Sequence, residues 1–388
     1  MTNCILRWIC VFIMVPAYVL LSQDMMTVYH PVTEKHLQPA HIRMKNEKPL
    51  VFLVAAAGDL MMGGSALSTI KSRGPDFPFD STRAVIGSAD MAVANLEAPF
   101  CTSGRAARKK YTFRVPPEFA GGIKRAGFDV LTLANNHLVD FGPDGLLCTL
   151  GVLDSLSILH CGAGRDAEQA GQAMVAEFNG WRIACLAFSL TYPSAFWAGE
   201  NRPGTAYPDF RRIKNQIRTL RSEVDLVIVS FHWGQELRNT PKAYQQAYAH
   251  DVIDWGADLV IGHHPHVLQG MEIYKGRLIA YSLGNYVFGS YSRNAVESVI
   301  LKIRFDHIGP LLAEVVPISV YNLQVNFQPR VRSGRARYNT LENLDALSSP
   351  LNRGKSFIQP RGFFAFPSYK ERPSREIGYS FAPPVHRR

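Results

Sequence analysis

The sequence lacks the cysteine pattern of a structural zinc site. Its six cysteines include no Cys-x-x-Cys pair, and thiolate zinc sites are built from such closely spaced cysteines. A zinc ribbon is therefore excluded. Four cysteines of the body are widely spaced, and one or two disulfides among them stay open if the body is exported: Cys101, Cys148, Cys161 and Cys185.

A signal-peptidase cleavage site is also missing. Residues 5–21 form a nearly continuous apolar run, which is at the short end of a membrane span. The residues that follow, Leu20–Asp24, lack a small-x-small pattern,. We therefore expect residues 1–23 to be an uncleaved N-terminal membrane anchor with the body outside the cytoplasm. Arg7 and Pro16 interrupt the run, so a cleaved signal followed by secretion stays the alternative. Residues 24–49 are polar and aperiodic, which indicates a linker.

The body has no excess of charge. Of the net charge of +10, the segment 328–388 supplies +8, because it holds twelve Lys and Arg against four Asp and Glu. The high isoelectric point therefore says little about the surface of the body. A basic tail suits an anionic lipid surface, a polyanion or nucleic acid, and a solvated tail without a partner is an equal alternative. We expect residues 322–388 to be mostly irregular.

Residues 50–321 alternate between apolar runs typical of strands and amphipathic patterns typical of helices, which predicts one large α/β layered domain. The expected strands are 51–57, 90–94, 129–133, 183–188, 226–231, 259–261 and 278–281, closed by a hairpin of 297–305 and 312–321. The expected helices are 117–126, 143–155, 210–221 and 242–255.

Six of the predicted strands end in residues that bind metals or transfer protons. In layered α/β proteins, ligands bind outside the carboxyl ends of the strands. Six such endings therefore predict a single shared site. Its candidates, in chain order, are Asp59, Asn95, Glu97, Asn135, Asn136, His137, Asp140, His232, Glu236, His264, His266 and Asn285.

Carboxylates, amide oxygens and imidazoles without thiolate form a ligand set that suits Mn, Fe, Zn or Mg. A carboxylate that bridges two such cations is a common device for activating water against a phosphoester, and one cation does the same more weakly. We therefore predict a divalent metal cofactor of one or two ions.

The same motifs, in this order, resemble those of the CapA-type proteins of capsule or poly-γ-glutamate biosynthesis, within the calcineurin-like metallophosphoesterase superfamily. The resemblance spans about residues 52–288 and rests on GDLM (58–61), NLEAP (95–99), ANNH (134–137), HWGQE (232–236), GHHPHVLQ (262–269) and YSLGN (281–285). It implies a four-layer α/β/β/α sandwich of the metallophosphoesterase type, a membrane anchor, an extracytoplasmic body and a role in making or exporting an anionic polymer.

The resemblance also implies roles for single residues. Asp59 corresponds to the first metal carboxylate and Glu97 to the bridging acid. The remaining metal ligands are Asn136, His232, His264 and His266. His137 corresponds to the catalytic acid, and Asp140 either supports it or caps the turn before Gly142. Asn95, Asn135, Glu236 and Asn285 are expected to support the ligands or to contact substrate.

Two positions depart from the superfamily pattern. His263 has no counterpart in its His-x-His motif and stays outside the predicted ligand set. Met61 stands where the superfamily has the histidine of Asp-x-His. A thioether is a poor ligand for hard cations, so the first metal position loses an imidazole. CapA-type proteins share this departure.

The first hypothesis is therefore a membrane-anchored, extracytoplasmic protein of capsule or poly-γ-glutamate biosynthesis, with a metal-dependent phosphoesterase-like hydrolase site. Its expected partners are an anionic polymer, the membrane and other subunits of a synthase, and nucleic acid is not expected. The basic run Arg105–Lys110, with Arg114, is either a solvated loop or a contact for that polymer. The alternatives are a non-enzymatic polyanion-binding component of a membrane complex and a secreted metallophosphodiesterase.

Overall fold

The computed structural model describes residues 48–366 of the 388-residue chain. The predicted anchor, residues 1–23, lies outside this range, and so does nearly all of the predicted linker. Within residues 48–366, no helix combines the length and the apolar character that a bilayer span requires.

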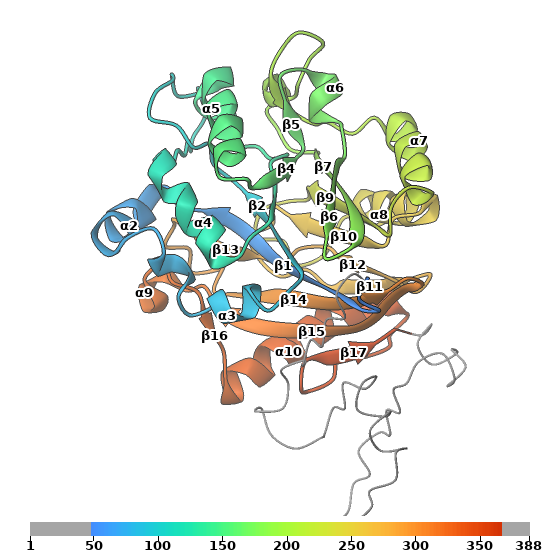
Figure 1. The fold of residues 1–388 in the computed structure, drawn as a ribbon. Helices are drawn as coiled ribbons and strands as arrows, with labels where there is room; N and C mark the ends of the chain where they lie inside the picture. Colours follow the sequence, from blue (N-terminus) through green and yellow to red (C-terminus); the bar gives the residue numbers. More distant parts are fainter. Residues whose placement is uncertain (1–47, 367–388) are drawn as a thin grey trace, which may run out of the picture. The chain divides into compact units, whose positions relative to one another are not determined.

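Two large β-sheets form the centre of the fold (Figure 1). The first has nine strands in the order β16-β15-β14-β1-β2-β3-β4, with β13 paired to β1 and β17 to β15. The second has six strands in the order β11-β12-β10-β9-β7-β6. The first sheet comprises β1 (Phe52–Met61), β2 (Met91–Leu96), β3 (Val130–Thr132), β4 (Leu159–Cys161), β13 (Asn285–Phe288), β14 (Glu297–Asp306), β15 (Gly309–Ser319), β16 (Arg330–Val331) and β17 (Phe363–Ala365). The second comprises β6 (Met174–Phe178), β7 (Trp181–Ser189), β9 (Leu226–His232), β10 (Leu259–His263), β11 (Met271–Tyr274) and β12 (Arg277–Ala280), and a separate pair is formed by β5 (Ala163–Gly164) and β8 (Gly204–Thr205).

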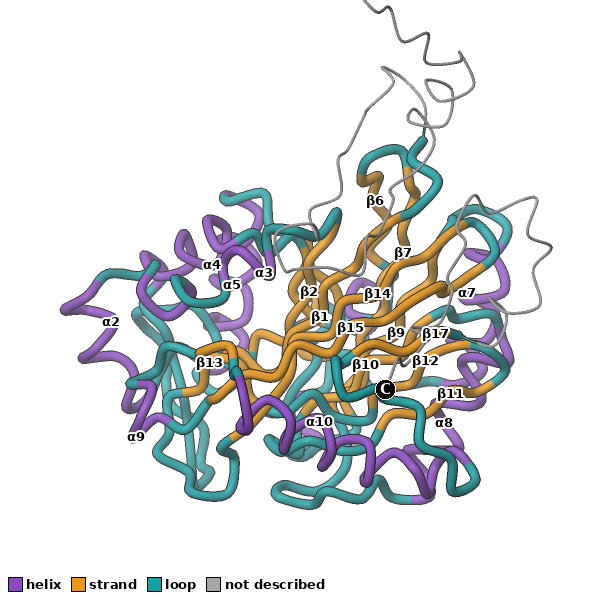
Figure 2. Tube along the Cα trace, turned by 90° about the horizontal axis from the view of Figure 1, so that it is seen from below, coloured by secondary structure: helices purple, strands orange, loops and turns teal. Residues whose placement is uncertain are grey.

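Helices lie on both sides of the strands, as the view from below shows (Figure 2). They are α2 (Leu67–Arg73), α3 (Arg83–Ile86), α4 (Ala120–Ala126), α5 (Gly142–Ser155), α6 (Ala167–Ala170), α7 (Phe210–Arg221), α8 (Ala243–Trp255), α9 (Asn322–Val325) and α10 (Gly334–Ser348). Short 3₁₀ helices are η2 (Gly64–Ala66), η3 (Phe77–Phe79), η4 (Pro117–Phe119), η5 (Ser194–Phe196) and η6 (Ser349–Asn352).

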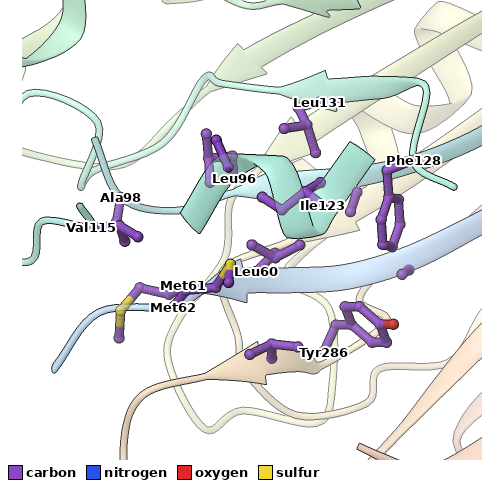
Figure 3. Packing of buried hydrophobic residues seen from close by; sticks show 14 of the residues in the cluster. Leu60, Met61, Met62, Leu96, Ala98, Val115, Ile123, Phe128, Leu131 and Tyr286 are labelled. Carbon is purple, nitrogen blue, oxygen red and sulfur yellow. The ribbon is translucent and has the colours of Figure 1, made fainter. Parts of the chain in front are cut away.

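Alternating side chains of β1 show how the layers are held together, because successive residues of a strand face opposite sides. Val54 and Ala56 pack between the two sheets, in a cluster that includes Ile183 of β7 and Ile228 of β9. Ala55 belongs to the outer cluster of the first sheet, where α4 and α5 pack. Figure 3 shows part of that outer cluster, with α4 beside the ends of β1, β2 and β3.

The outer face of the second sheet is covered in the same way. Val227 and Val229 of β9 pack against Ile217 of α7 and Val252 of α8. These positions alternate with Ile228, which faces the other sheet. The central strands β1, β2, β9 and β10 are therefore buried on two faces, which explains why they are nearly continuous apolar runs,.

The alternation of strands and helices that the sequence predicts is confirmed. The helix predicted at 210–221 has those bounds, and the predicted hairpin is the antiparallel pair β14 and β15. All seven predicted strands before the hairpin end at a different residue in the structure, by one to four positions. β1 continues to Met61, β9 includes His232 and β10 includes His263, so these polar residues lie within the last pairs of the ladder and not beyond it.

The expectation of a mostly irregular segment after residue 321 is wrong for residues 322–366. This part of the chain holds α9, α10, β16 and β17, and β17 pairs with β15. Leu341 and Leu344 of α10 are buried in the cluster between the sheets. In the sequence these two leucines stand among polar residues. The hydrophobic pattern of this segment is therefore too weak to indicate a packed helix.

Gly262 allows the close approach of β10 to the segment after β12. A Cβ atom at this position would lie 1.9 Å from the Tyr281 carbonyl oxygen and 2.7 Å from Nε1 of Trp233. We predict that Gly262→Ala lowers the free energy of unfolding by about 2 kcal/mol or more, because the backbone must shift. Urea unfolding followed by circular dichroism measures the change.

The matched control is Gly151→Ala in α5, where a Cβ meets nothing within 4 Å. Alanine in an exposed helix interior should raise the free energy of unfolding by about 0.5–1 kcal/mol. Equal stability changes for the two variants would contradict the close packing at Gly262.

Candidate metal centre

The pocket lies where the carboxyl ends of parallel strands from both sheets meet. In the first sheet, Asp59 of β1 is level with Asn95 of β2 and with Asn285 of β13. In the second, His232 of β9 is level with His263 of β10. The register of the ladders therefore brings together residues that are up to 226 positions apart in the sequence, since Asp59 and Asn285 are paired.

Asn95 joins the two acids of the pocket. Its Nδ2 donates hydrogen bonds to Oδ1 of Asp59 at 2.9 Å and to Oε2 of Glu97 at 3.3 Å. Its Oδ1 accepts a hydrogen bond from Nδ2 of Asn135 at 3.1 Å. Both acids are fully buried. The Asn95 amide thus points its oxygen away from the pocket, which gives this residue a supporting role and not that of a ligand.

The histidine segment 263–266 leaves β10 with an unusual backbone. His264 and His266 have φ angles of 94° and 60°, a region that L-residues other than glycine rarely adopt. The His264 N–H donates to Oδ2 of Asp59 at 3.2 Å, and Nδ1 of His266 lies 3.0 Å from Oδ1 of Asn285. These contacts hold the strained segment in place, which is typical of functional sites.

Three overlapping groups of side chains place their ligand atoms within 4.8 Å of one another. They are Glu97 with His232 and His264, then Asp59 with Glu97 and His266, and then Glu236 with His264 and His266. Glu97, His264 and His266 each belong to two of the groups, so the three groups form one continuous set. Asn136 adds an amide oxygen, because its Oδ1 lies 2.8 Å from Nε2 of His232.

Two buried atoms in the pocket indicate whether these residues fit a metal. Neither Oε1 of Glu97 nor Nδ1 of His264 has a hydrogen-bond partner among residues 48–366. Such atoms are costly to leave unpaired in a protein interior. A divalent cation would satisfy both, and a carboxylate and imidazole set without thiolate suits Mn, Fe, Zn or Mg. The side chains therefore fit a divalent metal.

The pKa shifts of the two buried acids also favour a bound cation. Burial, and then the charge of Asp59, raise the pKa of Glu97 well above its usual range. Burial would also raise the pKa of Asp59, but hydrogen bonds from His263 and His266 hold it well below its usual value.

The imidazoles of the pocket differ among themselves. Burial and the His266 charge lower the pKa of His264 to about 3, and burial and His264 lower that of His232 well below the usual value. Burial would lower the pKa of His266 too, but the Glu97 charge and the Asp59 hydrogen bond raise it to about 9. His266 therefore favours its protonated form, whereas His232 and His264 favour the neutral imidazole that metal binding requires,.

His137 lies at one side of this pocket, held by Asp140. Its Nδ1 lies 2.7 Å from Oδ2 of Asp140, so Nδ1–H donates to the carboxylate and Nε2 is left to exchange a proton. The same carboxylate oxygen accepts from the Phe113 N–H at 2.7 Å. Of the two roles expected for Asp140, these contacts match support of His137 and not the turn at Gly142. Burial lowers the pKa of His137, against the opposing Asp140 hydrogen bond.

Lys109 is a site residue that the sequence pattern did not identify. Its Nζ lies 2.5 Å from Oδ1 of Asp140 and 3.1 Å from Nδ1 of His137, and it donates to the Asn136 carbonyl oxygen. The sequence pattern placed Lys109 only in the basic run 105–110. Charge alone does not distinguish it from Arg108 or Lys110, which are exposed.

The remaining candidates have distinct places. Asn135 is buried and accepts hydrogen bonds from the backbone N–H groups of His137 and Leu138 at 3.0 and 2.9 Å, so it shapes the loop that carries Asn136. Glu236 is exposed at the mouth of the pocket. His263, which we left out of the ligand set, is in none of the three groups, and its Nδ1 lies 3.0 Å from Oδ1 of Asp59.

Met61 contributes nothing to the pocket. It packs in the outer cluster of the first sheet (Figure 3), and its Sδ accepts a hydrogen bond from the Gly63 N–H at 3.2 Å. The position where the sequence resemblance implied the loss of a metal-binding histidine thus serves the core in this chain.

Comparison with proteins of known structure returns low similarity. A hypothetical protein from Thermus thermophilus is 17% identical with a TM-score of 0.44, and covers 69% of this chain and 99% of its own. The NAD nucleotidase of Haemophilus influenzae is 11% identical with a TM-score of 0.43, and covers 76% of this chain and 62% of its own.

Comparison with protein sequences is more informative. The capsule biosynthesis protein CapA of Bacillus anthracis is 31% identical over 284 residues, which cover 71% of this chain and 68% of the relative. The PGA biosynthesis protein CapA of Bacillus subtilis (strain 168) is 31% identical over 282 residues, 72% of this chain and 74% of the relative. A probable polyglutamine synthesis accessory protein of Mycobacterium tuberculosis is 30% identical over 262 residues, 64% of this chain and 68% of the relative.

The family model described as bacterial capsule synthesis protein PGA_cap matches residues 53–290. This range contains every residue of the pocket, from Asp59 to Asn285. The resemblance to CapA-type proteins that the sequence motifs indicated is therefore confirmed, and the chain belongs to the PGA_cap family of bacterial capsule synthesis proteins.

Proposed function

We propose that this protein is a metal-dependent hydrolase of the phosphoesterase type, with a four-layer α/β/β/α fold, that acts during the synthesis or export of an anionic capsule polymer. The observation that carries the proposal is the unpaired Oε1 of Glu97, buried among the imidazoles of His232 and His264 and next to the His137–Asp140 pair. A metal-binding set alone is compatible with a structural role. A buried set with a proton donor beside it supports hydrolysis.

Different residues of the pocket would bind the metal, transfer the proton and hold the acids in place. Asp59, Glu97, Asn136, His232, His264 and His266 would hold the metal. When bound, the metal would supply Lewis-acid charge and make a nearby water more acidic. In its protonated form, His137 would give the proton on Nε2 to the leaving oxygen, while Nδ1–H stays bonded to the Asp140 carboxylate. Asn95 keeps the two acids at a fixed separation through its shared amide.

Lys109 supports the proton donor from behind. Its ammonium group lies against Asp140, Asn136 and His137 and is only partly exposed, at 19% of the side chain. It therefore neutralises the Asp140 carboxylate and orders the loop that carries Asn136 and His137.

The place of action is proposed from sequence. The names of the relatives concern capsule, poly-glutamate and polyglutamine synthesis, and a capsule lies outside the cell. The apolar run 5–21 would hold the chain in the membrane with the body outside the cytoplasm,. Subunits of a polymer synthase would then be its neighbours.

We expect the purified full chain to hold one or two ions of Mn, Fe, Zn or Mg per protein chain. Glu97→Gln should weaken metal binding on the order of 100-fold, because it removes the shared carboxylate charge. Elemental analysis and metal titration measure both. The matched control is Glu272→Gln, a buried acid outside the pocket that bonds with Tyr281 and His250. Wild-type protein that takes up no metal would refute the proposal.

We expect His137→Gln to lower kcat for a generic phosphodiester such as bis-p-nitrophenyl phosphate by about 10²- to 10⁴-fold, with metal content unchanged. The loss is specific to proton transfer, so the KM should change little. His250→Gln, a partly exposed histidine paired with Glu272, serves as the control. If His137→Gln and Asp59→Asn both sustain polymer production at the wild-type level in cells, a non-enzymatic polyanion-binding component replaces this proposal.

We expect the full chain to stay with the membrane fraction after a high-salt wash, and a chain that starts at residue 24 to be released. Immunoblotting of the two fractions measures the distribution, and N-terminal sequencing identifies the mature start. A soluble wild-type product that begins near Asp24 would instead show a cleaved signal and a secreted enzyme.

A further inference from the structure

Two cysteine side chains meet between the two large sheets. Cys161 is the last residue of β4 in the first sheet, and Cys185 lies in the middle of β7 in the second. The Cys161 thiol donates to Sγ of Cys185 at 3.6 Å. Both side chains are buried in the cluster that fills the space between the sheets. The pair thus spans the interior of the fold from one sheet to the other.

The four cysteines of residues 48–366 can form two pairs in three ways,. Cys101 lies against α5, because a Cβ atom at Gly145 would be 3.4 Å from its Sγ. Cys148 is three residues further along the same helix, and residues at this spacing share a helix face,. The structure therefore matches Cys161 with Cys185 and not with either of the other two cysteines.

The two sheets come close together at this point. Sheets that pack face to face are usually about 10 Å apart, but Cα atoms of β4 and β7 approach to within 8 Å. A Cβ atom at Gly162, directly after Cys161, would lie 2.8 Å from the Cβ atoms of Ala134 and Ala187. Small residues on both sheets thus remove the usual obstacle to a cross-link, which is that cysteines on packed sheets are too far apart.

The cysteine pair takes no part in the metal pocket. No group of potential ligands among residues 48–366 includes either cysteine. The hydrogen bond to Cys185, and then burial, raise the pKa of Cys161 well above its usual value. The reactive thiolate is therefore disfavoured in the folded chain. Any oxidation of the pair belongs to folding, when both thiols still meet solvent.

We infer that Cys161 and Cys185 form a disulfide in the exported protein. This inference rests on the proposed place of action, outside the cytoplasm, and not on the hydrolase chemistry. Disulfides form in oxidising compartments and are rare in the cytosol. Each thiol gives up one proton and one electron as the two sulfurs bond. The two protons and two electrons reduce the disulfide of an extracytoplasmic thiol oxidant to two thiols.

The bond would connect the supports of the two sides of the metal pocket. In the first sheet, the Cys161 carbonyl oxygen accepts from the Leu133 N–H at 2.9 Å, just before the loop that carries Asn136. In the second, the strand of Cys185 pairs with β9, which ends in His232. Oδ1 of Asn136 lies 2.8 Å from Nε2 of His232. The disulfide would therefore restrain the separation of two predicted metal ligands from different sheets.

The test is peptide mass spectrometry of the full chain from the membrane fraction, unfolded without reductant in the presence of an alkylating reagent. We expect one cross-linked pair of peptides that holds Cys161 and Cys185 and disappears after reduction. The matched control is Cys148→Ala, which removes an exposed thiol and should leave this pair intact. Cys185→Ala should leave Cys161 as a thiol that the reagent labels.

The bond should also stabilise the fold. The two cysteines are 24 positions apart, and a disulfide across such a loop should raise the Tm of a domain of this size by about 5 °C. Differential scanning calorimetry with a chelator compares protein refolded with and without reductant, in a Cys148→Ala background that leaves Cys101 without its neighbour. Adding Cys161→Ala and Cys185→Ala together should abolish the effect of the reductant on the Tm.

Alkylation of both Cys161 and Cys185 in wild-type protein from cells would overturn the inference, and so would a bond from either one to a different cysteine. Refolding of the full chain in a glutathione redox buffer then separates the two causes. A bond that forms in the buffer but not in cells would also contradict the extracytoplasmic location. Absence of the bond in both would overturn the disulfide alone. Metal content and phosphodiesterase activity are judged separately, because neither measurement depends on this bond.

Discussion

The carboxylates of Asp59 and Glu97 repel each other because both are fully buried and share one amide partner, Asn95. The charge of Asp59 raises the pKa of Glu97, and burial adds to the effect. Asn95 lessens the repulsion by donating to both acids, and Asn135 in turn fixes the orientation of Asn95. What remains is a demand for positive charge at Glu97. A cation bound among the histidines meets that demand, so the same electrostatic constraint explains the amide pair, the imidazoles and the predicted metal.

The topology of the two sheets places the acids, the amide and the imidazoles close together. Parallel strands end at the same edge of a sheet, and two such edges meet in this fold, one carrying Asp59 and Asn95 and the other carrying His232. The strands that carry the pocket, β1, β2, β9 and β10, are buried on both faces and are therefore firm supports. The loops beyond them carry Lys109 and Glu236. Strands thus provide the inner residues of the pocket and loops the outer ones, as is usual for layered α/β proteins.

Much of this arrangement follows from local sequence. Apolar runs ending in Asp59, Glu97 or His232 indicated both the strands and the shared edge, because burial and ligand type can be inferred from neighbouring residues. Contacts between distant loops could not be inferred in this way. Lys109 reaches His137 and Asp140 only because the loop after β2 folds back over the next strand. The helix α10 was missed for a related reason, since its two buried leucines gain meaning only from the sheets on which they pack.

The left-handed backbone of His264 and His266 has a consequence for how such a chain can change over generations. These residues hold φ angles that glycine or asparagine would adopt with less strain,. Selection for thermal stability alone would therefore favour replacing the very imidazoles that the pocket needs. A lineage that no longer needed the chemistry would drift toward a more stable and inert protein with the same fold. Histidine at these two positions therefore costs stability that glycine or asparagine would not,.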